Sequence, residues 1–247
     1  NDQKITCNIN YLSTWIVTFS LISLCVTSVK KLKSDFKLTH FFETGTFKGE
    51  GVRSIQQFDF EKIYSCEIIE EYVASSRKIF TDDNRVQIFK GQSFEVIHKT
   101  TLELDANILF WLDAHFPGAD GGLNDFNSEV YEDTKYPLKK ELFHLSESRK
   151  GYQDFYIIDD LWIYDDSEFE HGFLPEYITP PEPRNFNFVN DYFRDTHTVI
   201  KCYDHGGYLV LIPKGLSTNI PFRDQQPLRK YLPFLYSRNS PHKLEIV

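Results

Sequence analysis

The sequence predicts an α/β protein with a doubly wound, mostly parallel sheet that closes with an antiparallel hairpin. Three observations lead to this fold class. Short apolar runs alternate with amphipathic stretches of about 10–15 residues between residue 34 and residue 160. The runs at 108–112 and 155–158 are apolar throughout, which is typical of central strands covered on both faces. Two further β-rich runs flank the turn at 204–207, whose glycines indicate a hairpin.

Strands and helices alternate in order along the chain. We expect strands at 40–46, 62–68, 86–93, 107–115 and 154–160, and helices at 51–58, 70–80, 94–103 and 137–148. Residues 161–195 are rich in aromatic residues and proline, and form a loop-like insertion. The hairpin follows at 197–215, and residues 216–247 form a C-terminal extension.

The chain length suits one large domain. The 247 residues, 41% of them hydrophobic, can bury a sizeable core, and we place this domain at residues 34–215. Residues 5–29 carry no charged side chain, and lysines follow them. A segment of that length can span a bilayer, with the lysines keeping the domain on the cytoplasmic side. Residues 1–33 are therefore either a membrane anchor or an extra helix, and the sequence leaves both open.

Composition narrows the function classes. The net charge is −9, with 36 acidic and 27 basic residues, which argues against a nucleic-acid binder. The four cysteines are scattered and form no C-x-x-C pair, so they suit a reducing, cytoplasmic compartment rather than a zinc or disulfide framework. The oligomeric state leaves no signature in the sequence.

Polar residues follow three consecutive strands. Gly45 in ETGTFKGEG lets backbone approach a ligand, and Gly49 can open the next helix. Glu67 ends the second strand, where an acid can accept hydrogen bonds from ribose hydroxyls, and Gln92 and Ser93 follow the third. Each feature alone fits an ordinary turn or a solvated acid, and the glycine spacing is not that of the dinucleotide fingerprint. Together, at one rim of the sheet, they favour an adenosine ligand.

Acidic residues follow the fourth and fifth strands. Asp113 and His115 are two residues apart, so they project to the same side, and Asp159 and Asp160 end the neighbouring strand. Carboxylates gathered at one rim repel one another unless they are protonated or bind a cation, and oxygen ligands suit Mg²⁺ or Mn²⁺. The alternatives are that Asp159 and Asp160 cap the following turn and that His115 is a structural histidine.

The motifs ETGTFKG, SCE, GQS, LDAH and IIDD, in this order, resemble class I S-adenosylmethionine-dependent methyltransferases over residues 38–215. The resemblance implies a seven-stranded sheet closed by the hairpin. It also implies a set of residues that bind S-adenosyl-L-methionine, with the methionine part near the first strand, the ribose near the second and adenine near the third: Glu43, Thr44, Gly45, Thr46, Gly49, Glu67, Gln92, Ser93 and Asp113. Phe47 stands where these enzymes usually have a second glycine.

The acidic cluster is similar to that of metal-dependent O-methyltransferases of the catechol and macrocin types. This resemblance implies that Asp113, Asp159 and Asp160 hold Mg²⁺ or Mn²⁺, which would orient a substrate hydroxyl and lower its pKa. His115, beside Asp113, is the candidate base, and His205 is a weaker one. The implied activity is O-methylation of a small molecule or sugar. Two alternatives stay open: metal-independent N- or carboxyl-methylation, and a non-catalytic module that binds an adenosine cofactor.

Two segments are expected to border this site. Glycines at 118, 121 and 122 make the loop after the fourth strand permissive, as in a lid. Aromatic residues of the insertion are candidates for a substrate wall: Trp162, Tyr164, Phe169, Phe173 and Tyr177.

Overall fold

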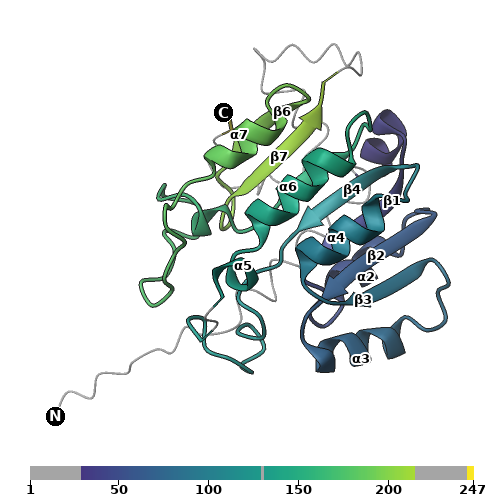
Figure 1. Ribbon diagram of the computed structural model, residues 1–247, viewed down its shortest axis with the longest axis horizontal. Coiled ribbons are helices and arrows are strands. Elements are labelled where there is room, and N and C mark those ends of the chain that lie inside the picture. Colours follow the sequence, from purple (N-terminus) through teal and green to yellow (C-terminus); the bar gives the residue numbers. More distant parts are fainter. Residues whose placement is uncertain (1–28, 129–130, 215–243) are drawn as a thin grey trace.

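The computed structural model describes residues 29–128, 131–214 and 244–247 (Figure 1). One sheet runs through it in the strand order β3-β2-β1-β4-β5-β7-β6-β8. The strands are β1 (Leu38–Thr44), β2 (Lys62–Glu67), β3 (Val86–Lys90), β4 (Asn107–Leu112), β5 (Phe155–Ile158), β6 (His197–Cys202), β7 (Tyr208–Pro213) and β8 (Leu244–Ile246).

The first five strands are parallel, and β7 pairs antiparallel with both β5 and β6. The predicted fold class is therefore confirmed, including the closing hairpin. The sheet has one strand more than the seven implied by the sequence, because β8 pairs antiparallel with β6 through Ile200 and Ile246. β8 is only three residues long and is defined by its pairing with the distant strand β6. It could therefore not be predicted from the local sequence pattern.

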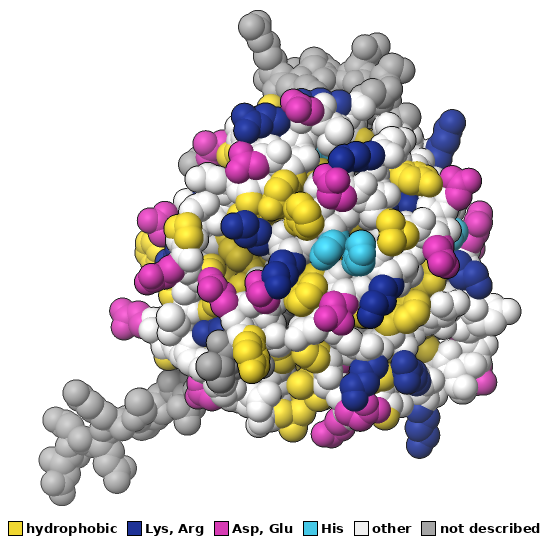
Figure 2. Space-filling view, in the orientation of Figure 1, with side chains coloured by type: hydrophobic (Ala, Val, Ile, Leu, Met, Phe, Trp, Pro, Cys, Tyr) yellow, Lys and Arg dark blue, Asp and Glu magenta, His cyan; other side chains and the backbone are white. Residues whose placement is uncertain are grey.

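Helices cover both faces of the sheet. Their bounds are α2 (Glu50–Ile55), α3 (Glu70–Ile79), α4 (Ser93–Thr101), α5 (Glu132–Lys135), α6 (Leu138–Ser148) and α7 (Asn187–Phe193), with the 3₁₀ turn η1 at Leu161–Ile163. In Figure 1, α4, α6 and α7 lie in front of the sheet. Acidic, basic and hydrophobic side chains are mixed on this face of the molecule (Figure 2).

Alternating side chains divide the core into two layers. Phe41 and Leu109 belong to the layer that also contains Val52 of α2 and Val73 of α3. The next residues on the same strands, Phe42 and Phe110, belong to the other layer, with Leu142 of α6. The period of two in strands and the apolar stripe of each helix thus produce the doubly wound arrangement.

The chain before β1 adds to one layer. Residues 29–36 are helical, and Val29, Leu32 and Phe36 are buried in the core, on one face of that helix. The rest of the predicted uncharged segment lies outside the described residues. Within the described ranges, every helix is too short or too polar to cross a bilayer.

Residues 161–195 contain more regular structure than the sequence predicts. They include η1 and α7, whose Val189 and Phe193 are buried against the sheet. The aromatic residues that made this segment look like a loop supply that apolar face.

The strand order reverses at β1, which lies between β2 and β4. In a doubly wound sheet the crevice beyond the carboxyl ends of such strands is the usual ligand site. Residues 43–47, 67–69, 113–116 and 159–160 all lie at or just after strand ends at this rim.

Candidate active site

Two carboxylates and an imidazole converge beyond the ends of β4 and β5. His115 Nε2 lies 3.2 Å from Asp113 Oδ1 and 3.0 Å from Asp160 Oδ2. Donor atoms of the three residues all lie within 4.8 Å of one another. Neither ring nitrogen of His115 has a hydrogen-bond partner with suitable geometry, although both are buried. A ring nitrogen facing two carboxylates in this way fits a shared cation.

The electrostatics of this cluster are strongly coupled. Burial alone would lower the pKa of the His115 imidazole, but the Asp113 and Asp160 carboxylates raise it well above its usual range. Burial raises the pKa of the Asp113 carboxyl, while His115 opposes that rise. Without a metal ion, a protonated His115 would therefore offset one of the two negative charges of Asp113 and Asp160. With a metal ion, the neutral ring would be one of its ligands.

The cluster differs from the predicted carboxylate triad in one member. Asp159 Oδ1 accepts a hydrogen bond from the Asp160 backbone N–H at 2.8 Å, so this carboxylate caps the turn that follows β5. Burial and the Asp113 and Asp160 carboxylates raise the pKa of Asp159 well above its usual range. Asp159 is thus near the cluster, while His115 occupies the third donor position that the sequence analysis gave to Asp159.

Asp113 also contacts the loop after β1. A Cβ atom on Gly45, whose φ is +82°, would lie 2.7 Å from the Asp113 carbonyl oxygen. The Gly45 and Thr46 N–H groups both donate to the Cys66 carbonyl, at 3.0 and 3.1 Å. The predicted need for glycine at position 45 has a specific cause here: the backbone passes directly against the end of β4. The loop and the acidic cluster are therefore held in contact.

Glu43 is buried rather than open to solvent. Its Oε2 accepts a hydrogen bond from Ser65 Oγ at 2.7 Å, and that hydroxyl also lies 2.6 Å from Thr46 Oγ1. A Cβ on Gly51 would lie 1.7 Å from Glu43 Oε1, so the carboxyl packs under the first turn of α2. Burial raises the pKa of Glu43 to about 8, although the Ser65 hydroxyl lowers it. Protonated at neutral pH, Glu43 can donate as well as accept.

Glu67 ends β2 as predicted, and its carboxylate binds backbone. Oε1 accepts from the N–H groups of Ile68 and Ile69 at 2.8 and 2.9 Å, and Oε2 accepts from Phe47 N–H at 2.9 Å. Phe47 has φ +46°, the left-handed conformation that a glycine adopts more readily. Glu67 therefore fixes the loop around Phe47, and the ring of Phe47 packs edge-on against Tyr72.

The loop after β4 covers this end of the sheet. A Cβ on Gly121 would lie 1.6 Å from the Tyr72 hydroxyl, and one on Gly118 would lie 3.3 Å from Leu123 Cβ. Gly121 thus lets the loop pack closely on Tyr72 of α3, and Gly118 lets the loop fold back on itself. The predicted role of this loop as a lid stays a prediction.

Next to Ser93, which follows β3, lies the buried carboxyl of Glu141, which was not among the predicted site residues. Gln92 Nε2 donates to Thr134 Oγ1 at 2.7 Å, and the Ser93 hydroxyl is buried. Glu141 of α6 is 1% exposed; burial raises its pKa to about 7, opposed by the Ser93 and Thr44 hydroxyls. The signal was present in the sequence, because Glu141 lies within the stripe formed by Leu138, Leu142 and Leu145.

The aromatic residues predicted to form a substrate wall differ in their exposure to solvent. Tyr164 and Phe169 are buried members of the core, so they pack the insertion rather than line a site. Phe173 and Tyr177 are 59% and 65% exposed. Trp162 lies between these extremes, next to the hairpin turn at Gly206.

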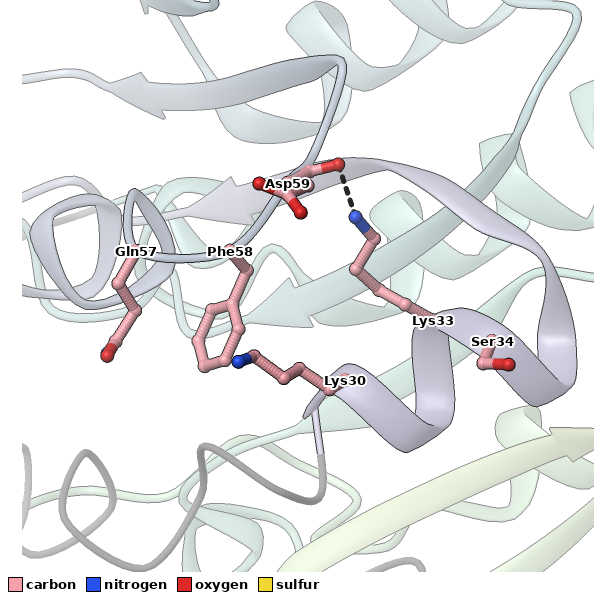
Figure 3. Close-up of a pocket in the computed structure, with 6 residues that line it drawn as sticks. All are labelled: Lys30, Lys33, Ser34, Gln57, Phe58 and Asp59. Atoms are coloured by element: carbon pink, nitrogen blue, oxygen red, sulfur yellow. Dashed lines mark hydrogen bonds between the residues drawn. The ribbon is translucent and has the colours of Figure 1, made fainter.

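A groove at the amino-terminal ends of the strands, opposite the acidic cluster, is separate from this site. Figure 3 shows its lining, which comes from the segments that precede β1 and β2: Lys30, Lys33, Ser34, Gln57, Phe58 and Asp59. Lys33 Nζ donates to the Asp59 carbonyl, as the dashed line in Figure 3 marks. Residues that precede parallel strands lie at the amino-terminal edge, across the sheet from the acidic cluster.

Comparison with known proteins identifies the fold. No protein-family model matches the sequence, and a search of curated proteins also gave no match. Among solved structures, a methyltransferase from Podospora anserina with bound SAH is similar, with a TM-score of 0.52 and 13% identity over 82% of this chain and 80% of that one. The chain has the class I methyltransferase fold.

Two other solved structures are similar to this class I fold. A protein from Corynebacterium glutamicum has a TM-score of 0.50 and 11% identity over 81% of this chain and 80% of that one. A putative caffeoyl-CoA O-methyltransferase from Staphylococcus aureus has a TM-score of 0.48 and 14% identity over 75% of this chain and 80% of that one. At such identities the likeness concerns the fold, and function has to be argued from the site.

Proposed function

We propose that the chain transfers a methyl group from S-adenosylmethionine to a hydroxyl group of a small molecule or sugar, assisted by a divalent metal ion. The observation that carries the proposal is the position of Asp113. Its carbonyl abuts Gly45 in the loop after β1, and its carboxylate faces His115 and Asp160. Asp113 thus contacts both the rim where the class I fold places its cofactor and a cluster that is suited to a cation.

The residues at this rim support an adenosine-type cofactor. The close backbone approach at Gly45, and polar groups at the ends of β1, β2 and β3, are the features that the fold uses for such a ligand. In this proposal Glu43, Thr44, Thr46 and Gly49 border its methionine part, Glu67 its ribose, and Gln92 and Ser93 its adenine. The sulfonium of the bound cofactor supplies the reactive methyl group.

The donor set supports a metal ion at Asp113, His115 and Asp160. Two carboxylates and one imidazole suit Mn²⁺ particularly well, and Mg²⁺ where water completes the shell. When bound, the ion would act as a Lewis acid that lowers the pKa of a substrate hydroxyl. The chain would hold the hydroxyl oxygen beyond the ends of β4 and β5, facing the methyl group next to Gly45.

A base role for His115 is a separate proposal, because a ring nitrogen that binds a cation does not accept a proton at the same time. The metal-independent alternative also has a specific observation in its favour. A protonated His115, 3.2 and 3.0 Å from two carboxylates, would offset one of their two negative charges without any metal ion. The metal-assisted mechanism predicts that methyl transfer depends on added metal, whereas the metal-independent alternative predicts that it does not.

The test is titration of the protein with Mn²⁺, followed by spectroscopy, for the wild type and for Asp113→Asn and Asp160→Asn. We expect each substitution to weaken Mn²⁺ binding by at least about tenfold and to reduce methyl transfer to catechol and sugar hydroxyls. Asp166→Asn, an exposed acid in the neighbouring insertion, is the matched control and should bind as the wild type does. Unchanged Mn²⁺ binding in both site variants, or methyl transfer that is indifferent to chelation, would refute the metal-assisted mechanism.

A further inference from the structure

A second cluster of metal-ligand type lies outside the candidate active site. It consists of Glu170, His171 and His205, whose donor atoms all lie within 4.8 Å of one another. Glu170 and His171 belong to the insertion after β5, and His205 belongs to the turn between β6 and β7. We call these three residues the His–Glu cluster.

Backbone hydrogen bonds hold the two segments of the His–Glu cluster together. Glu170 N–H donates to the Tyr203 carbonyl at 2.9 Å, and His171 N–H donates to the His205 carbonyl at 3.0 Å. The Glu170 carboxylate in turn accepts from His205 N–H at 3.0 Å through Oε2. The side chains are therefore oriented by the main chain before any ligand binds.

The two imidazoles face each other through nitrogen atoms. His205 Nδ1 lies 3.3 Å from His171 Nε2, a separation at which only one of these two nitrogens carries a proton. His205 has φ +54°, which is uncommon for a residue with a side chain. This conformation turns its ring towards His171 across the junction of the two segments. Such strain at a position with converging donors is a feature of functional sites.

The donor types distinguish this cluster from the one at Asp113. Two imidazoles and one carboxylate are ligands for Zn²⁺ and similar transition metals, whereas Mg²⁺ and Ca²⁺ prefer oxygen. Glu170 and His171 are exposed, so solvent can reach the remaining coordination position. A three-ligand site open on one side is the arrangement that lets zinc bind water or an external donor.

The turn that carries His205 also touches the candidate active site. A Cβ on Gly206 would lie 2.7 Å from Asp160 Oδ1. The N–H groups of Leu161 and Trp162 donate to the Gly207 and Gly206 carbonyls at 2.9 and 2.8 Å. The hairpin turn thus packs directly against the residue that supplies one acid of the active-site cluster.

We propose that Glu170, His171 and His205 bind a divalent transition-metal ion of the zinc type, which clamps the insertion onto the hairpin turn beside Asp160. This site is independent of the proposed methyl transfer. Its ion would link two segments more than 30 residues apart in sequence, with the imidazole nitrogens and the Glu170 carboxylate as ligands.

The test is binding of Co²⁺, a spectroscopic substitute for Zn²⁺, to the full chain, with competition by Zn²⁺. We expect visible absorption typical of nitrogen ligation, and one ion per chain in the Asp113→Asn, Asp160→Asn background, where the active-site cluster no longer competes for Co²⁺. In that background His171→Gln and His205→Asn should each lower the Co²⁺ affinity at least about tenfold. Asparagine at 205 tolerates the left-handed backbone, so this variant removes the ligand and keeps the turn.

Two controls make the result specific. The double variant His98→Gln, His144→Gln removes another histidine pair, with ring centroids 4.5 Å apart on α4 and α6. Burial, and then the neighbouring His98 and Lys140, lower the pKa of His144 there. This double variant should bind Co²⁺ as the wild type does. The double variant Asp113→Asn, Asp160→Asn should retain the Co²⁺ spectrum even if it loses Mn²⁺. Equal Co²⁺ affinity in the Asp113→Asn, Asp160→Asn background with and without His171→Gln or His205→Asn, or no Co²⁺ binding by the wild type, would overturn the proposal.

Discussion

At the scale of single residues, close contacts explain why particular side chains are required at the rim. Gly45 combines a positive φ with a backbone that passes against the Asp113 carbonyl. Gly151 has a similar φ of +94°, but a Cβ there would meet nothing within 4 Å. Substitutions at these two glycines therefore distinguish the cost of a positive φ from the cost of a steric clash.

We therefore predict that Gly45→Ala lowers the free energy of unfolding more than Gly151→Ala does. Strain at a positive φ costs about 1–3 kcal/mol in both variants, and the 2.7 Å approach to the Asp113 carbonyl adds to it only at position 45. Urea unfolding of both variants measures the difference. Equal losses of stability would show that the loop can move away from β4 without cost.

His197 gives a prediction for pH dependence. Its Nε2 lies 3.1 Å from the Asp154 carbonyl and its Nδ1 lies 2.8 Å from Thr196 Oγ1, an arrangement that fits a neutral ring. Burial lowers the pKa of His197 to about 4. Since the unfolded chain has a pKa near 6.5, it binds more protons than the folded chain between about pH 4 and pH 6.5.

The contribution of His197 to stability is thus complete above about pH 6.5 and is lost as the pH falls towards 4, by about 3 kcal/mol in total. Glu43 and Glu141, whose pKa values burial raises to about 8 and about 7, change stability with the opposite sign over an overlapping pH range, so the test compares the wild type with a variant that lacks only His197. The unfolding free energy of the wild type minus that of His197→Gln should rise as the pH increases from 4 to 6.5, because the carboxyl groups contribute equally to both proteins and cancel in the difference. A difference that does not change with pH would contradict the prediction, because it would mean that His197 has the same pKa in the folded and unfolded states.

At the scale of elements, a buried ion pair joins the end of α6 to the start of β4 and β5. Arg149 Nε lies 2.7 Å from Asp154 Oδ2, and each side chain is 1% exposed. Asp154 Oδ1 also accepts from Ile108 N–H at 2.8 Å. The pair therefore ties two central strands to the helix that carries Glu141.

We predict that Arg149→Leu destabilises the protein by about 3–5 kcal/mol, because it leaves a buried carboxylate without its partner. Arg194→Leu is the matched control, since Arg194 pairs with Asp191 at 3.1 Å where both side chains are about two-thirds exposed. Such exposed pairs contribute about 0–1 kcal/mol. Thermal or urea unfolding measures the stability of the two variants. Equal losses of stability in Arg149→Leu and Arg194→Leu would contradict the prediction.

At the scale of the whole molecule, regular periodicity made the sheet and most helices predictable. The apolar run from Ile108 to Leu112 and the alternation of strands and helices determined the order of elements from β1 to β7. The rim could be predicted for the same reason, because residues that follow parallel strands end at one edge. Asp113 and Asp160 were brought together in this way.

What the sequence did not reveal depends on contacts between distant segments. β8 exists through its pairing with β6, and the His–Glu cluster depends on a loop folding onto the hairpin turn. The alternation of side chains placed His115 beside Asp113, but its contact with Asp160 follows from side-chain geometry that periodicity does not encode. The same holds for Glu67 as an acceptor for the Phe47 backbone. Glu141 is the exception, because a charged residue within an apolar stripe was visible in the sequence.

The central claim is that the rim at Gly45, Glu67 and Asp113 binds S-adenosylmethionine. Calorimetric titration of the full chain with S-adenosylmethionine, paired with thermal unfolding at the same ligand concentrations, tests it most directly. We predict saturable binding at one site per chain and a melting temperature that rises with ligand concentration, since a ligand that binds only the folded state stabilises it. No heat of binding and no thermal stabilisation would contradict the claim.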